Sequence, residues 1–216
     1  MNTEIKYKDG FGNIITEEQQ KYLTEYEKIT YEMNQIKMIE YFKKHRGIDR
    51  KTVDYFLSSD KDKNDILQKY SDPVNHVRCI LYFNNQIANN FNLWDWESYS
   101  EDAQITFKGK IVYDSKHRLI FYCSFNLLTN KLDNGAWKNY YGNIFENEHD
   151  DKLLIFDYDN NGDIDWIIDI KEKFGYTKGI SLNQYLADTD FSQVDFPWDK
   201  HPYYHTVTPY LPTGDL

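Results

Sequence analysis

The chain has 216 residues, of which 40% are hydrophobic, 17% aromatic and 28% charged, so it is long enough to bury a core built largely from rings. Its 25 Lys and Arg residues against 35 Asp and Glu residues give a net charge of −10. This acidic balance disfavours nucleic acid and anionic membranes as partners, and it favours basic proteins or metal cations.

The first third of the chain is expected to hold a hairpin followed by helices. Apolar residues flank a turn-rich stretch, which predicts a hairpin over residues 4–15. Thr16 followed by Gln19 predicts a capping box that opens a helix. Apolar residues then recur at helical spacing and extend this helix to about residue 44: Tyr22, Leu23, Tyr26, Ile29, Met33 and Ile36. The alternative is a strand over residues 38–42. A second, short helix is expected before Pro73.

The rest of the chain is expected to be β-rich and to end in a strap. Aliphatic and aromatic runs predict strands over residues 77–83, 105–113, 119–127, 153–156 and 164–170. The tail from Phe196 contains four prolines with rings between them, so it cannot form a regular helix. We therefore expect an α+β fold, with an N-terminal helical segment packed on a C-terminal antiparallel β-meander sheet. A single domain over 1–216 would comprise a hairpin plus helices (1–75), a β-rich part (76–195) and the strap (196–216).

Two short segments of the chain share one turn pattern. The stretch from Tyr113 to Leu119 aligns with that from Tyr158 to Ile164, and residues 7–14 form a looser echo. Each is Tyr-Asp or a close variant, then a turn, then an aliphatic residue that begins a return strand. Such a pattern fits an antiparallel meander in which Asp bonds the turn amides.

Two further features set expectations about the environment of the chain. Cys79 and Cys123 lie in apolar runs and are interpreted as buried small hydrophobes, with a bridge between them left open. No apolar run approaches membrane-spanning length, and the N-terminus has no apolar signal region. A cytoplasmic protein is therefore expected. The abundance of Tyr, Asn, Lys and Ile is typical of an AT-rich bacterial genome, so a bacterial source is expected as well.

The stretch from Asp157 to Asp165 carries the clearest chemistry. Oxygen-bearing side chains fall at alternate positions around Gly162, which suits a hard cation such as Ca²⁺: Asp157, Asp159, Asn161, Asp163 and Asp165. An EF-hand loop has a Glu at its twelfth position and a helix on each side. Here the twelfth position is Ile168, and the segments before and after the loop favour strands, so an EF-hand is rejected.

The pattern Asp-x-Asp-x-Asn-Gly-x-x-Asp between apolar strands resembles the calcium-binding hairpin of FG-GAP and VCBS-type repeats, over residues 153–168. The resemblance implies ligands from the side chains of Asp157, Asp159, Asn161 and Asp165 and from the carbonyl of Asp163. Those families repeat the motif around a propeller, whereas this chain shows it once, so their fold does not carry over. The alternative is a plain hairpin turn, since Asn-Gly is a strong type I′ signal.

A second group of residues is dense in rings and acids: Trp94, Asp95, Trp96, Glu97 and Tyr99. Trp and Tyr dominate interface hot spots, so this group is a candidate partner-binding surface. The alternative is core packing by alternate residues of a strand. His201 and His205 are a weaker metal candidate, because Pro202 disfavours the helix that such spacing needs.

These observations favour a non-catalytic, soluble protein-binding protein. An immunity or inhibitor protein that neutralises a basic partner fits the acidic, aromatic-rich composition. The alternative is a calcium-dependent module that binds carbohydrate or protein through loop 157–165. A hydrolase is the third hypothesis, although the sequence contains no nucleophile elbow and no phosphate-binding glycine loop. The only cofactor considered is Ca²⁺.

Overall fold

The computed structural model describes residues 3–45, 48–58, 63–142, 153–170, 178–187 and 196–212. Within these ranges, thirteen strands form one mixed sheet, accompanied by three short helices and two 3-10 turns. The protein is therefore β-rich. The expected α+β class with an N-terminal helical segment is wrong, because the residues of that segment pair as strands.

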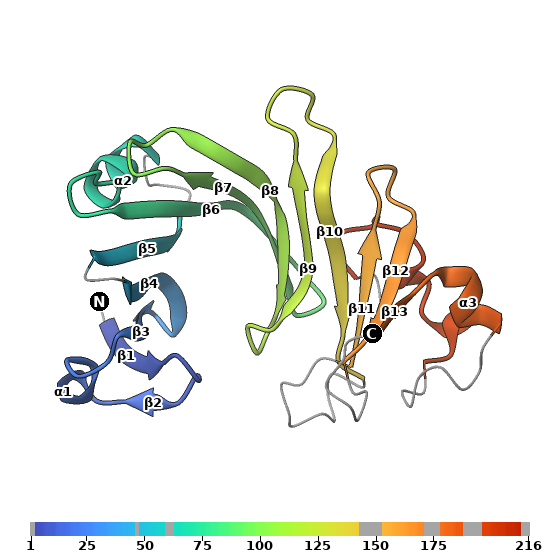
Figure 1. Cartoon of the computed structure of the whole chain (residues 1–216), viewed down its shortest axis with the longest axis horizontal. Coiled ribbons are helices and arrows are strands. Elements are labelled where there is room, and N and C mark those ends of the chain that lie inside the picture. The colour runs from blue at the N-terminus through green and yellow to red at the C-terminus, as the bar shows by residue number, and fades with distance from the viewer. Residues whose placement is uncertain are drawn as a thin grey trace. The chain divides into compact units, whose positions relative to one another are not determined.

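The strands follow one another across the sheet almost in chain order (Figure 1). The order of neighbours is β13-β12-β11-β10-β9-β8-β7-β6-β5-β4-β3-β1-β2. Their bounds are β1 Thr3–Asp9, β2 Ile14–Ile15, β3 Glu25–Glu32, β4 Gln35–His45, β5 Ile48–Phe56, β6 Val77–Ala88, β7 Phe91–Tyr99, β8 Ile105–Asp114, β9 Leu119–Phe125, β10 Leu132–Tyr140, β11 Leu154–Tyr158, β12 Ile164–Asp169 and β13 Lys178–Ile180. One pair, β5 with β6, is parallel, and helix α2 (Lys63–Tyr70) lies in the connection between them. A parallel pair needs such a crossover.

The expected long helix is replaced by a single turn of helix and a hairpin. The Thr16–Gln19 capping box is present, but helix α1 covers only Glu17–Gln20. Met33 and Asn34 then take positive φ angles of 50° and 63°, which is the conformation of a tight hairpin turn between β3 and β4. The hairpin expected over residues 4–15 is confirmed by the antiparallel pairing of β1 with β2.

Backbone contacts divide the chain into two compact units, which are described separately. Unit 1 comprises residues 1–84 and 96–108, and unit 2 comprises residues 85–95 and 109–216. In unit 1, α2 packs Ile66 and Leu67 onto the sheet next to the buried thiol of Cys79. The rest of that cluster consists of Tyr55, Leu81 and Tyr99, with Met38, Leu57, Tyr70, Phe83 and Ala103 at its margin.

The core of unit 2 lies between one face of its strands and the strap, which we define as residues 196–212. Four strap side chains are buried in this core: Phe196, Tyr203, Tyr204 and Val207. Its 3-10 turns are Trp198–Lys200 and Pro202–Tyr204, so the expectation of an ordered, non-helical strap holds for these residues. Helix α3 (Leu182–Ala187) completes the unit. Cys123 is buried here, both cysteines are buried as expected, and no bridge joins them.

The turn pattern shared along the sequence corresponds to one recurring structure. At the ends of β1 and β8, and directly after β11, an aspartate accepts hydrogen bonds from the backbone N–H groups two and four residues ahead: Asp9, Asp114 and Asp159. Each aspartate also donates its own N–H to the carbonyl oxygen four residues ahead. The predicted role of Asp in bonding turn amides is therefore confirmed.

Candidate functional site

The acidic loop between β11 and β12 is a hydrogen-bonded turn. One carboxylate oxygen of Asp159 accepts hydrogen bonds from the backbone N–H groups of Asn161 and Asp163, at 2.8 and 3.0 Å. The other oxygen accepts a hydrogen bond from the Asn161 side-chain amide at 3.1 Å. The bonds to the charged carboxylate, first among them that from the Asp163 N–H, lower the pKa of Asp159. Two of the five candidate calcium ligands therefore bond each other and the turn.

The tip of this turn receives the strap. The Val207 N–H donates a hydrogen bond to the Gly162 carbonyl oxygen at 2.9 Å, and Asp163 forms an isolated β-bridge with Thr206. The Asp163 carbonyl oxygen, which the family resemblance would make a ligand, accepts the Asp159 N–H at 2.8 Å. The loop tip thus serves as a docking point for the strap.

The two remaining candidates, Asp157 and Asp165, lie close together. Asp157 pairs with Trp166 across β11 and β12, whereas Tyr158 pairs with Ile164, so Asp165 is the extra residue of a β-bulge. Burial raises the pKa of Asp157, and the negative charge of Asp165 raises it further. The structure therefore brings together two of the five predicted residues as a pair of carboxylates.

No group of three or more His, Cys, Asp or Glu side chains that could hold a metal ion is found within the described ranges. The calcium site at 157–165 stays a prediction. The turn hydrogen bonds show what holds the loop in its shape, and they use oxygens that the predicted site would need.

Around Asp157, the side of the sheet that faces away from the unit 2 core forms a hollow. We call this side the outer face. Ile155 and Asp157 alternate with buried core residues of β11, and Trp166 and Ile168 do the same on β12. Together with Gly179 of β13, these four side chains line a cavity of about 400 Å³. Trp166 is 45% exposed.

The hollow belongs to a row of rings that crosses three strand pairs. Asp157 stands between Trp166 on one side and Trp137 of β10 on the other. Trp137 in turn pairs with Tyr122 of β9, and their rings stack with centroids 4.2 Å apart. Sequence reasoning missed Trp166 and Trp137. The β11 sequence, Leu-Ile-Phe-Asp-Tyr, does not alternate between polar and apolar residues, and the bulge at Asp165 hides the register of β12.

The residues of the second predicted group are distributed over both units. Trp94 and Asp95 belong to unit 2, whereas Trp96, Glu97 and Tyr99 belong to unit 1. Trp96 and Tyr99 are buried. Asp95 forms an ion pair with Lys110, and Glu97 forms an ion pair with Lys63 and accepts a hydrogen bond from the Tyr99 hydroxyl. These contacts are those of packed strand residues, and partner binding by this group stays a prediction.

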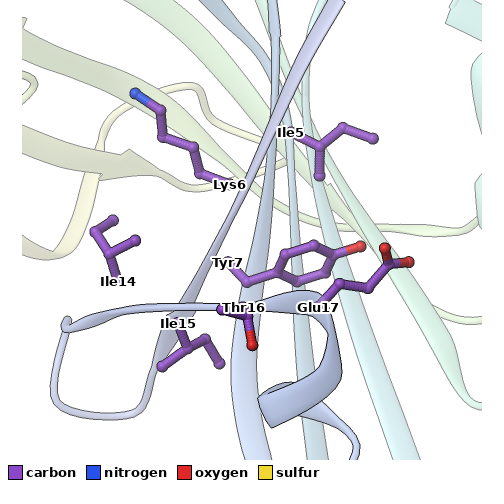
Figure 2. A pocket seen from close by; sticks show the side chains of 7 residues that line it. All are labelled: Ile5, Lys6, Tyr7, Ile14, Ile15, Thr16 and Glu17. Atoms are coloured by element: carbon purple, nitrogen blue, oxygen red, sulfur yellow. The ribbon is translucent and has the colours of Figure 1, made fainter.

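A second hollow, of about 370 Å³, lies at the edge of unit 1 (Figure 2). It is lined by Ile5, Lys6, Tyr7, Ile14, Ile15, Thr16 and Glu17. Strand β2 pairs only with Tyr7 and Lys8, so the preceding residues of β1 have no described strand beside them on that edge. Figure 2 shows Ile5 and Tyr7 on one side of β1 and Lys6 on the other. Lys6 pairs with Glu4 at 3.4 Å, so the charges at this edge compensate one another.

Lys138 is a fully buried cation that the sequence did not single out. Its ammonium group donates hydrogen bonds to the carbonyl oxygens of Tyr203, Thr206 and Pro209 in the strap. Burial lowers the pKa of Lys138 to about 7. Three carbonyl acceptors use all three N–H bonds of an ammonium group, whereas a neutral amine has two, so these contacts favour the charged form. Lys138 therefore fastens the strap to the sheet.

Asp54 is a buried carboxylate in unit 1. The Tyr82 hydroxyl donates a hydrogen bond to it at 3.1 Å. Burial, followed by the charge of Glu27, raises the pKa of Asp54 to about 7, and hydrogen bonds from Tyr82 and Tyr41 oppose that shift. Asp54 lines neither of the two hollows described above, and we consider its effect on stability.

The two histidines of the strap are packed against neighbouring rings. The His201 ring stacks on Phe196 with centroids 4.7 Å apart, and the His205 ring stacks on Trp198 at 4.1 Å. His205 Nε2 also lies 3.0 Å from the Trp198 carbonyl oxygen. Both rings thus take part in the internal packing of the strap.

Neither a protein-family model, nor a curated protein, nor a solved structure matches this chain. Of the helices in the described part, none is long and apolar enough to cross a membrane. The resemblance of residues 153–168 to the FG-GAP and VCBS hairpin therefore stays a prediction.

Proposed function

We propose that this protein is a non-catalytic binding protein that neutralises a basic protein partner, in the manner of an immunity or inhibitor protein. One observation carries the proposal. On the outer face of unit 2, the half-exposed ring of Trp166 lies beside Asp157, and Asp165 adds a second carboxylate.

Physical chemistry supports a protein partner at this face. A Trp ring supplies a large contact area at little cost in conformational entropy, and Trp is enriched among the residues that carry interface affinity. Complementary charge speeds encounter, and the net charge of −10 acts in the same direction as the local carboxylates. A basic partner is therefore the class that this surface suits best.

The proposal is tested by using this chain to capture partners from the native host at physiological salt. The purified product of the neighbouring gene is tested separately as a candidate partner. The wild-type chain is compared with Trp166→Ala and with Tyr22→Ala, which removes an exposed ring from unit 1. We expect a stoichiometric basic protein that binds wild type and Tyr22→Ala equally. Truncating a Trp hot spot weakens binding by at least about tenfold, so Trp166→Ala should lose the partner.

Two results would contradict the proposal. One is the absence of any stoichiometric protein partner at physiological salt. The other is a partner that Trp166→Ala retains as well as wild type does. The salt dependence of the association rate gives an independent check, because steering by opposite charges weakens as ionic strength rises.

A further inference from the structure

The carboxylates of the outer face lack a described positive neighbour. The β-bulge places Asp165 next to Asp157, close enough for its charge to raise the pKa of Asp157. No Lys or Arg side chain in the described part of the chain forms an ion pair with either aspartate. Asp157 is partly withdrawn from water and Asp165 is exposed, and a cation that approaches from outside stabilises two such neighbouring like charges.

The hollow beside these carboxylates has an aromatic wall and an apolar lining. Trp166 lies against Gly179, where an added Cβ would come within 3.3 Å of the indole Cε3. The absence of a side chain at Gly179 therefore gives the ring its place over β13. Ile155 and Ile168, which pair with each other across β11 and β12, complete the lining.

We infer that this hollow binds an arginine side chain of the protein partner, with the guanidinium group stacked on Trp166 and hydrogen-bonded to Asp157 and Asp165. The inference rests on the proposed function and names the chemical group that the surface recognises. The methylene stem of the arginine lies along Ile155 and Ile168. A cavity of about 400 Å³ has room for one such side chain.

Arginine fits this arrangement better than the other ligands with suitable charge or shape. Its planar guanidinium stacks on aromatic faces and offers five N–H donors, which suits two carboxylates beside one ring. A lysine ammonium is a compact, strongly hydrated charge with no plane to stack. A calcium ion needs six to eight oxygen ligands, whereas the hollow presents one carboxylate, that of Asp157, and an indole, with the Asp165 carboxylate beside it.

The test is an NMR titration of the full chain with N-acetyl-L-arginine amide, following the indole N–H signal of Trp166. N-acetyl-L-citrulline amide, which has the same shape without the charge, and N-acetyl-L-lysine amide are titrated in parallel. Asp157→Asn is compared with Asp163→Asn, which removes one charge from the same hairpin at an exposed position outside the hollow. We expect saturable binding of the arginine compound. The citrulline compound should bind wild type about tenfold more weakly than the arginine compound does, because it carries no charge. The arginine compound should bind Asp157→Asn about tenfold more weakly than wild type, because one charged acceptor is lost.

Three outcomes overturn the inference: no shift of the Trp166 signal with the arginine compound, equal binding of the lysine compound, or equal weakening by Asp163→Asn and Asp157→Asn. A negative titration combined with a captured partner that Trp166→Ala loses overturns the arginine assignment and leaves the proposed function standing. A positive titration with no captured partner overturns the proposed function instead.

Discussion

The ammonium nitrogen of Lys138 lies 3.8 Å from the centroid of the Tyr203 ring, while it also donates a hydrogen bond to the Tyr203 carbonyl oxygen. Tyr158 and Phe121 flank the same ammonium at 5.6 and 5.9 Å. A cation held between ring faces and carbonyl dipoles is stabilised without a carboxylate partner. One side chain of β10 therefore secures a strap that lies 65 to 71 residues further along the chain.

Replacing Lys138 should release the strap. Lys138→Met keeps much of the volume but leaves three carbonyl oxygens without their donor, and each buried unsatisfied acceptor costs about 1–3 kcal/mol. We expect the free energy of unfolding of unit 2 to fall by about 3 kcal/mol or more, and residues 196–212 to become sensitive to protease. The control is Lys131→Met, an exposed position at which a change of no more than about 0.5 kcal/mol is expected. Equal losses in chemical denaturation of the two variants would contradict this role.

Asp54 should make the stability of the protein depend on pH. Its pKa is about 7 in the folded protein against a model value of 3.8, so the folded state holds a proton that the unfolded state releases. Stability that this proton provides is complete below pH 3.8 and is lost as pH rises from there to about 7. A shift of three pKa units corresponds to about 4 kcal/mol at most.

Asp54→Asn removes the titration while keeping the shape of the side chain. We expect the variant to gain stability relative to wild type as pH rises between about 4 and 7, and to keep a constant difference at higher pH. Urea denaturation at several pH values measures this difference. Asp65→Asn, on the first turn of α2, is a control that loses the same charge. Parallel stability curves for wild type and Asp54→Asn would contradict the assignment.

Local turn chemistry was predictable from the sequence, whereas the fold class was not. The turn at Asp159 follows from Asp, Asn and Gly at fixed offsets, and its relative at Asp114 shares the Asp, whose side chain bonds amides two and four residues ahead. The helix predicted after Thr16 was wrong because the apolar residues of that segment fit both the 3.6-residue period of a helix and the two-residue period of a strand. What decides for strands is the turn at Met33 and Asn34, where two non-glycine residues adopt positive φ without an Asn-Gly signal.

The candidate surface was predictable only in part, for a related reason. Asp157 was singled out from the sequence, but Trp166 becomes its neighbour through strand pairing. A bulge shifts the register by one residue, and a shift of one residue moves every side chain to the opposite face. Single-sequence spacing does not encode that shift, so the row from Trp166 to Tyr122 emerges only from the paired strands.

Removing the turn aspartate should cost more stability at Asp114 than at Asp159. Both aspartates bond turn amides, but Asp114 also forms a buried ion pair with Arg118, with Nε and Oδ2 2.7 Å apart. Removing one partner of a buried pair costs about 3–5 kcal/mol. The turn hydrogen bonds of Asp159 are open to solvent, so water can replace them and their loss costs much less. We therefore expect Asp114→Ala to destabilise unit 2 far more than Asp159→Ala in denaturant melts, and similar losses would show that the ion pair adds nothing.

Gly162 and Gly12 form a matched pair that separates backbone strain from steric contact with the strap. Both occupy the same position in related turns, with φ angles of +89° and +86°. A Cβ on Gly12 meets nothing within 4 Å, whereas a Cβ on Gly162 would lie 2.5 Å from Val207 Cγ1. Gly12→Ala should therefore cost about 1 kcal/mol from the left-handed backbone alone. Gly162→Ala should cost about 1–3 kcal/mol more, because Val207 must move and the strap with it.

Unfolding free energies of the Gly162→Ala and Gly12→Ala variants measure this difference. Protease sensitivity of residues 196–212 in Gly162→Ala alone identifies the strap as its source. Equal costs, or an intact strap in Gly162→Ala, would mean that Val207 adjusts freely and that the loop tip does not hold the strap in place.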